Sequence, residues 1–187
     1  MIKNIVFDPG NVLISFQPVE YFEKLGYPVK KINIIISDIF KSREWKLIDN
    51  GDITSSEAIE KIAARSSLKQ QEIASIFDLR TEILYPIDKN INLLPGLKFR
   101  GYKLYFLSNF PGDIFDAVYK EYKFFAFFDG GIISARVNAS KPDRKIFEIL
   151  LEKYSLTANE CLFIDDIELN VRSADSVGMQ GVFALES

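Results

Sequence analysis

The sequence predicts an α/β fold in which helices cover a parallel sheet and a small helical domain is inserted after the first strand. Short apolar runs fit buried strands, and helical patterns follow these runs or lie between them. A long stretch, residues 8–102, separates the first run from the second. A crossover between parallel strands needs only about a dozen residues, so this stretch is expected to be a domain and not a loop.

The expected strands of the core are rich in β-branched and aromatic residues. They are Ile2 to Phe7, Lys103 to Leu107, Cys161 to Ile164 and Gly181 to Leu185. Helical patterns cover Asp113 to Tyr122, Asp143 to Tyr154 and Glu168 to Val177. Ligands of open α/β sheets bind at the carboxyl ends of the strands, so the polar residues that end these runs are the candidates for function.

The inserted stretch reads as helical throughout. The expected helices are Val19 to Leu25, Lys30 to Ile48, Ser55 to Ser66 and Leu68 to Leu84. Thr54 and Glu57 have the spacing of a capping box at the start of the third helix. We therefore expect a core domain of residues 1–15 and 95–187 and a helical domain of residues 16–94.

Composition excludes several classes of function. The chain has 187 residues, 23 basic and 26 acidic, and a net charge of -3, so no global positive field attracts nucleic acid or an anionic membrane. It has no histidine, which excludes Ser-His and Cys-His nucleophilic pairs and zinc sites built on imidazole. Cys161 is expected to be a core thiol. With no apolar run of membrane-spanning length, we expect a cytoplasmic protein.

The first two candidate elements are polar residues that follow expected strands. Asp8 ends the first run in a turn that contains Gly10, and its carboxylate could be a nucleophile, a metal ligand or an ordinary turn residue. Ser108 and Asn109 end the second run just before a helix. Their hydroxyl and N-H groups could hold phosphate oxygens, although a helix N-terminal turn has the same residues.

Lys141 is the third candidate, and it stands just before a helix that begins with Pro142 and Asp143. A cation is unfavourably placed at a helix N-terminus, so Lys141 is expected to have another partner, either Asp8 or a phosphate. The alternative is a lysine that is merely solvated.

The fourth candidate element is the pair Asp165 and Asp166 at the end of an apolar strand. Adjacent carboxylates repel each other unless a cation lies between them and Asp8. Ligands that are all oxygen atoms favour a hard ion such as Mg²⁺. A solvated acidic loop is the alternative interpretation.

Taken together and in this order, the four elements resemble the four signature motifs of the haloacid dehalogenase superfamily, and they span almost the whole chain. The resemblance implies a Rossmann-like core with a helical cap of the C1 class. The stretch from Glu44 to Ile53 is similar to a recurrent cap pattern of that class. The Asp-x-Gly-Asn form that begins at Asp8 is similar to a subgroup that includes sugar-1-phosphate phosphatases.

The resemblance implies a Mg²⁺-dependent phosphatase that hydrolyses a small phosphorylated metabolite through an aspartyl-phosphate on Asp8. It implies that Ser108 and the N-H of Asn109 hold the phosphoryl oxygens and that Lys141 neutralises both nucleophile and phosphate. It also implies a Mg²⁺ site made of Asp8, the Gly10 carbonyl and Asp166, with Asp165 a direct or indirect partner of the ion.

Two residues depart from the family pattern. Gly10 stands where most of these phosphatases have an aspartate that acts as general acid and base, and such a loss costs roughly a hundred-fold or more in rate. The loss matters least for an acidic leaving oxygen, which favours sugar 1-phosphates or acyl phosphates. Pro9 has no N-H to offer to the phosphate, where the family normally has one.

Two other functions remain open from the sequence. One is a haloacid dehalogenase, although the carboxylates of Asp165 and Asp166 would then repel an anionic substrate. The other is a catalytically weak pseudo-phosphatase that acts by binding, which Gly10 and Pro9 would suit. The aromatic stretch from Phe124 to Phe128 is expected to pack in the core and not to form a dimer surface. The sequence leaves the oligomeric state open.

Overall fold

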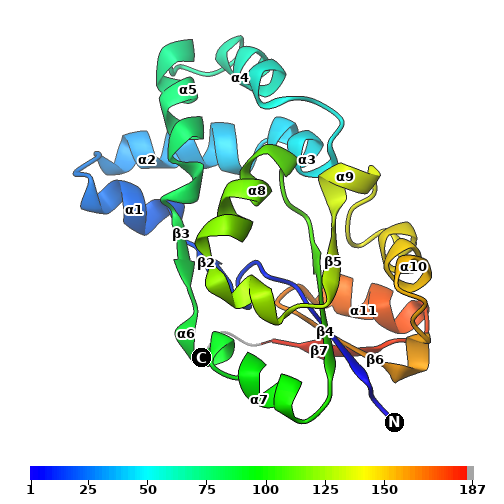
Figure 1. Ribbon diagram of the computed structural model, residues 1–187. Coiled ribbons are helices and arrows are strands. Elements are labelled where there is room, and N and C mark those ends of the chain that lie inside the picture. Colours follow the sequence, from blue (N-terminus) through cyan, green and yellow to red (C-terminus); the bar gives the residue numbers. More distant parts are fainter. Residues whose placement is uncertain (185–187) are drawn as a thin grey trace.

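A five-stranded parallel sheet forms the centre of the molecule in the computed structural model, which describes residues 1–184 (Figure 1). The strand order is β5-β4-β1-β6-β7. The strands are β1 (Asn4–Phe7), β4 (Lys103–Ser108), β5 (Gly130–Ile133), β6 (Cys161–Asp165) and β7 (Gln180–Phe183). In the register, Asn4 lies opposite Lys103 on one side and Cys161 on the other. The predicted α/β class is confirmed.

Alternate residues of the strands face two layers of helices. One face of the sheet, with Ile5 and Phe7, packs against α7 (Leu94–Phe99) and α8 (Gly112–Glu121). The other face, with Val6, packs against α10 (Arg144–Lys153) and α11 (Glu168–Ser176). The central strand β1 is therefore buried on both faces, which explains the apolar run from Ile5 to Phe7 in its sequence.

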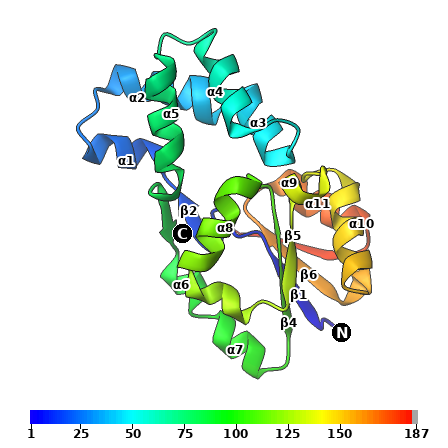
Figure 2. The same cartoon turned by 45° about the horizontal axis from the view of Figure 1, so that its top comes forward.

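The inserted helices are α1 (Pro18–Lys24), α2 (Val29–Ile35), α3 (Arg43–Asn50), α4 (Ser55–Ala63) and α5 (Gln70–Asp78). They lie together on one side of the sheet (Figure 2). Their own hydrophobic cluster includes Phe22, Ile35, Ile62 and Phe77. A two-stranded antiparallel ribbon, β2 (Ile14–Phe16) with β3 (Leu84–Pro86), joins them to the core. The proposed domain boundaries at residues 16 and 94 stay a prediction.

The remaining short elements complete the connections. They are α6 (Asp88–Ile91), α9 (Ser134–Val137) and the 3-10 turns Leu79–Thr81, Lys123–Phe127 and Ala158–Glu160. Within the described residues, no helix is long and apolar enough to cross a membrane.

Two predicted helices are wrong in part. The expected helix from Lys30 to Ile48 is broken, because α2 passes through a π-helical turn, Ile36–Phe40, and α3 begins afresh after Ser42. Ser42 has an extended backbone, and its hydroxyl accepts a hydrogen bond from the N-H of Trp45 at 3.0 Å, so it caps a new helix. The expected helix from Leu68 to Leu84 ends much earlier, and Leu84 begins strand β3 instead.

Strand β5 was not predicted, because two glycines begin it. Both glycines are required by close packing. An added Cβ at Gly130 would lie 2.5 Å from the ring of Tyr154, and one at Gly131 would lie 2.2 Å from the ring of Phe106. The glycines thus allow aromatic rings to cover the edge of the sheet.

Several smaller predictions are confirmed. Thr54 and Glu57 form the capping box at the start of α4. Cys161 is a fully buried free thiol. Within the aromatic stretch, Phe124 and Phe125 are buried in the core. The last expected strand is present as β7, while Leu185, its expected end, lies outside the described residues.

Polar contacts hold the end of α3 and the end of α5 against the core. The Ser134 hydroxyl donates to the carbonyl of Asp49. On the other side, the Arg80 guanidinium pairs with Asp113 at 2.9 Å, and the Ser55 hydroxyl donates to the same carboxylate at 2.7 Å. These contacts position the inserted helices over the carboxyl ends of the strands.

We expect Gly131→Ala to lower the free energy of unfolding by about 1–3 kcal/mol, because the new Cβ would overlap the buried ring of Phe106. Gly96→Ala is the matched control, since a Cβ there meets nothing within 4 Å and lies in α7. That control should be neutral or stabilising by roughly 0.4–1 kcal/mol. Urea unfolding of both variants checks this, and equal stabilities would contradict the packing described for β5.

Candidate active site

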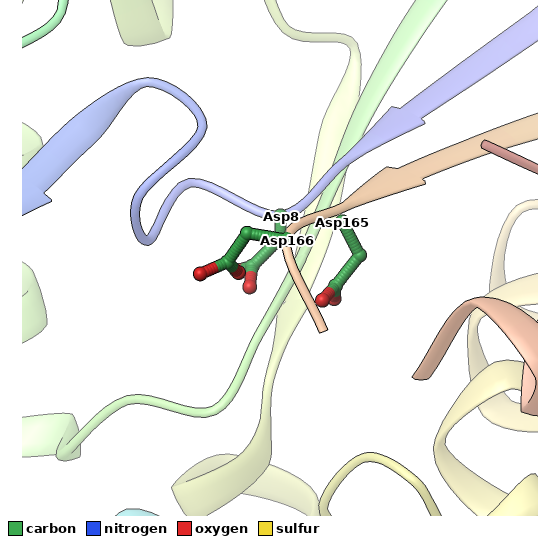
Figure 3. Close-up of side chains that lie close together, drawn as sticks. All are labelled: Asp8, Asp165 and Asp166. Carbon is green, nitrogen blue, oxygen red and sulfur yellow. The ribbon is translucent and has the colours of Figure 1, made fainter. Parts of the chain in front are cut away.

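The predicted polar residues meet at the carboxyl ends of neighbouring strands. Asp8 follows β1, Ser108 ends β4, and Asp165 ends β6 with Asp166 directly after it. Figure 3 shows the side chains of Asp8, Asp165 and Asp166 extending from the ends of β1 and β6 into the same region. One oxygen atom from each of these three carboxylates lies within 4.8 Å of the others. The sheet therefore gathers an acidic cluster from segments far apart in the sequence.

Lys141 lies inside this cluster. Its side chain is 1% exposed, and its Nζ is 2.8 Å from Asp8 Oδ2 and 2.7 Å from Asp165 Oδ2. The expected partner of a lysine at a helix start is thus present. Asn109 holds the backbone of Lys141 on both sides, because its Nδ2 donates to the Lys141 carbonyl and its Oδ1 accepts from the Lys141 N-H, each at 2.8 Å.

Asp165 is fully buried and already has partners for both oxygens. Besides Lys141, it accepts hydrogen bonds from the N-H of Ile167 at 2.8 Å and from the Asn170 amide at 3.0 and 3.1 Å. Asp166 is half-buried and accepts from the Asn11 amide at 3.0 Å. Asp8 and Asp166 therefore have more capacity to bind an ion than Asp165 does.

The loop after Asp8 is a tight turn held by its own backbone. The Pro9 carbonyl accepts from the N-H groups of Leu13 and Ile14 at 2.9 and 2.8 Å. The Gly10 N-H donates to Asp8 Oδ1 at 3.2 Å. Asn11 takes a left-handed conformation with φ 51°, which asparagine tolerates. The Asn11 side chain thereby ties the turn to Asp166.

Burial gives the cluster unusual electrostatics. Burial, helped by the charges of Asp165 and Asp166 and opposed by Lys141, raises the pKa of Asp8 to about 7. Burial also raises the pKa of Asp166. One lysine among three carboxylates leaves an excess of negative charge, and all the donors are oxygen atoms. This donor set fits a hard divalent cation such as Mg²⁺.

Two cavities meet at Asp8, and they share the residues Gly10, Asp49 and Asn109. The larger, of about 440 Å³, is polar and includes Lys46, Ser140, Lys141 and Asp166. The smaller, of about 160 Å³, includes Ser108 and is otherwise mostly apolar, with Ile14, Phe16, Trp45, Leu84, Phe110 and Ile114. A charged group and an apolar group could therefore bind on either side of Asp8.

Sequence reasoning missed the cavity residues of the inserted helices. Trp45 and Asp49 lie on α3, and Arg80 follows α5. They reach the site only through the packing of the inserted helices on the core. Trp45 and Asp49 lie in the stretch from Glu44 to Ile53 that is similar to a recurrent cap pattern, but that similarity gave neither residue a role in the site. The roles of Asn11 and Asn170 in fixing Asp166 and Asp165 were also not predicted, although both residues stand close to the motifs they support.

Asp8→Asn is expected to unfold at higher denaturant than the wild type at about pH 8 in EDTA. The folded-state pKa of Asp8, about 7, exceeds the ordinary value of 3.8, so the folded state binds the extra proton. The contribution of Asp8 to wild-type stability should therefore fall as pH rises from 3.8 to about 7, and asparagine removes this contribution. Urea unfolding across this range measures it. The exposed control Asp52→Asn should follow the wild type, and parallel profiles for all three proteins would contradict the burial effect.

Two curated proteins resemble the chain along its length. A sesquiterpene phosphatase of Aspergillus oryzae is 29% identical over 185 residues, which cover 99% of this chain and 91% of that protein. A drimenol cyclase of Aspergillus calidoustus is 26% identical over 185 residues, or 97% of this chain, but the match covers only 34% of the cyclase. This chain thus corresponds to about a third of the second protein.

The chain shares its fold with solved structures, and its sequence matches a described protein family. A HAD family enzyme of Bacteroides thetaiotaomicron, crystallised with magnesium and inorganic phosphate, superimposes with a TM-score of 0.75 at 24% identity. The match covers 98% of this chain and 94% of that one. Residues 2–178 match the family described as haloacid dehalogenase-like hydrolase. The chain therefore belongs to the haloacid dehalogenase-like hydrolase family.

Proposed function

We propose that this protein is a Mg²⁺-dependent phosphatase that transfers a phosphoryl group from a small phosphorylated metabolite to Asp8 and then to water. The observation that carries the proposal is the buried carboxylate of Asp8, paired with Lys141 and placed where a polar and an apolar cavity meet. The similarity of the whole chain to a sesquiterpene phosphatase supports the same reaction class.

Each residue has a role that its position supports. Asp8 would attack phosphorus and form an aspartyl-phosphate. The Ser108 hydroxyl and the Asn109 N-H would hold the phosphoryl oxygens, and Lys141 would neutralise both the nucleophile and the phosphate. Asp8, Asp166 and the Gly10 carbonyl would hold Mg²⁺, which when bound would neutralise phosphoryl charge and favour the ionised form of Asp8. Asp165 would contribute through Lys141, which it contacts directly.

A dehalogenase is the first alternative function. A metal-free site with three carboxylates and one lysine would repel the carboxylate of a haloacid, whereas a cation would convert the same cluster into an anion site. A protein that only binds phosphate is the second alternative. The pairing of Asp8 with Lys141 supports catalysis over binding alone, because binding has no need of a nucleophile.

We expect hydrolysis of p-nitrophenyl phosphate to require Mg²⁺, to stop in EDTA and to fall to background in Asp8→Asn. This substrate suits the test because its leaving group needs no proton. Asp166→Asn should raise the Mg²⁺ concentration for half-maximal rate about tenfold or more, since a ligand is lost. Asp52→Asn, an exposed change of the same kind, should behave as wild type. Chloride release from 2-chloropropionate in EDTA, without phosphatase activity, would replace this proposal with the dehalogenase.

The substrate class has two candidates. Gly10 favours a substrate whose leaving oxygen is already acidic, such as a sugar 1-phosphate. The apolar cavity supports a phosphate ester with an apolar organic group instead. Its volume of about 160 Å³ is comparable to that of an engineered apolar cavity that binds benzene, roughly 150 Å³.

Polar partners for sugar hydroxyl groups are few in this cavity. The Arg80 guanidinium is already bonded to Ser55, Asp113 and the Phe77 carbonyl. Asp49 is the other charged side chain of the inserted helices that lines it. The lining therefore favours the apolar ester, which also agrees with the substrate named for the Aspergillus oryzae relative.

Phe110→Ala is expected to raise KM for an aryl or short prenyl phosphate about tenfold, because apolar area in the cavity is lost. Acetyl phosphate, whose methyl group is too small to fill the cavity, should keep its kcat/KM within about twofold. Steady-state kinetics on both substrates and on a sugar 1-phosphate make the comparison. A preference for the sugar 1-phosphate, with Phe110→Ala affecting all substrates alike, would favour the first candidate.

A further inference from the structure

The turn after Asp8 has no side chain that could protonate a leaving group. A Cβ at Gly10 would have the carboxylate oxygens of Asp8 as its nearest neighbours, both at 3.8 Å, so the space beside the nucleophile is open. Hydrolysis of an ester with a poor leaving group needs a proton donor in this space. Any donor must therefore come from another segment.

Asp49 borders this space from the inserted helices. It lies near the end of α3 and lines both cavities, each of which also includes Asp8 and Gly10. Among the described residues, its carboxylate has no hydrogen-bond partner, in contrast to Asp8, Asp165 and Asp166. Asp49 therefore has a free acidic group at the junction of the polar and apolar cavities.

The backbone that carries Asp49 is fixed to the core. The Asp49 carbonyl accepts from the Ser134 hydroxyl. Gly51, which ends α3 with φ 79°, lies so close to α9 that a Cβ would be 2.5 Å from the Ala135 carbonyl oxygen. Such close contact holds the end of α3 in place over the nucleophile, as a positioned acid requires.

The surroundings keep the Asp49 carboxyl protonated near neutral pH. Burial raises its pKa to about 8, while Arg80 opposes this rise. The other charged groups that line the same two cavities are Asp8, Lys46, Lys141 and Asp166. Charged side chains on the elements packed against α3 bond to partners other than Asp49. Arg136 forms an ion pair with Asp116, and Glu57 and Asp38 accept hydrogen bonds from Thr54 and Ser66.

We infer that Asp49 is the general acid and base of this site and takes the place of the aspartate missing at Gly10. This inference rests on the proposed phosphatase function. In the first step, Asp8 forms a bond to phosphorus, the bond from phosphorus to the ester oxygen breaks, and the bonding electrons go to that oxygen. Asp49 gives its proton to the same oxygen, so a neutral alcohol leaves.

The second step restores both aspartates. Asp49, now a carboxylate, takes a proton from water as the water oxygen attacks phosphorus. The bond between phosphorus and Asp8 breaks, its electrons return to the Asp8 carboxylate, and inorganic phosphate leaves. Atoms and charge balance without another reactant.

The test compares two substrates that differ in their need for a proton, p-nitrophenyl phosphate and phenethyl phosphate. Asp49→Asn should lower kcat/KM on phenethyl phosphate about a hundred-fold or more, and kcat/KM on p-nitrophenyl phosphate by less than about threefold. The comparison uses kcat/KM because it reports only the steps up to release of the alcohol and not the later hydrolysis of the aspartyl-phosphate, which both substrates share. Asp52→Asn, an exposed aspartate that follows α3, should leave both rates within about twofold of wild type. Asp49→Ser should show the same split as Asp49→Asn, and retained p-nitrophenyl phosphate turnover proves that both variants are folded.

The pH dependence gives a second readout. Wild-type kcat/KM for phenethyl phosphate should decline on the alkaline side as Asp49 loses its proton, and this decline should be absent from kcat/KM for p-nitrophenyl phosphate. Equal losses of kcat/KM on both substrates in Asp49→Asn, or no loss of kcat/KM on phenethyl phosphate, would overturn the role of Asp49 alone. A wild type that hydrolyses neither substrate with Mg²⁺ would overturn the phosphatase function itself.

Discussion

The buried ion pairs of Lys141 with Asp8 and Asp165 are the interaction on which the site depends. Removing charges from water is costly, and a buried ion pair is often no more stable than apolar residues of similar size. The protein nevertheless supports these pairs with further hydrogen bonds: Asn109 donates to the Lys141 carbonyl, and the Asn170 amide and the Ile167 N-H donate to Asp165. So many polar contacts around one buried centre are expected where the charged groups take part in a reaction, and not where they only stabilise the fold.

The two parts of the chain contribute different things to the site. The sheet supplies charged groups at strand ends, where the register of β1, β4 and β6 fixes their separation. The inserted helices supply Trp45 and Asp49, which both lie on α3. Changes in the insertion could thus alter which organic group binds while the charged cluster keeps its geometry.

The charged cluster could be predicted because parallel strands bring their carboxyl ends to one edge. Asp8, Ser108 and Asp165 each follow a recognisable apolar run, so their proximity follows from the fold class. Lys141 was predicted by a different argument, its unfavourable position at a helix start. These inferences needed only local sequence and one general rule of topology.

The remaining features depend on contacts between distant segments. Strand β5 begins with two glycines, which are required because the rings of Phe106 and Tyr154 leave no room for a Cβ. Strand β3 has apolar residues that continue a helical pattern, and only its remote partner β2 shows that it is a strand. The break before α3 did carry a local signal, the capping residue Ser42, which the apolar periodicity around it obscured.

The contacts that fasten the inserted helices to α8 and α9 have a kinetic consequence. They are hydrogen bonds and one ion pair, made by Ser55, Arg80 and Asp113 on one side and by Ser134 and Asn138 on the other. Water can replace each of these partners, and the Asp113 side chain of the ion pair is already 48% exposed. The contacts between the inserted helices and the core can therefore break and re-form in solution. An organic molecule larger than the opening of the closed cavity could then enter and leave between catalytic cycles.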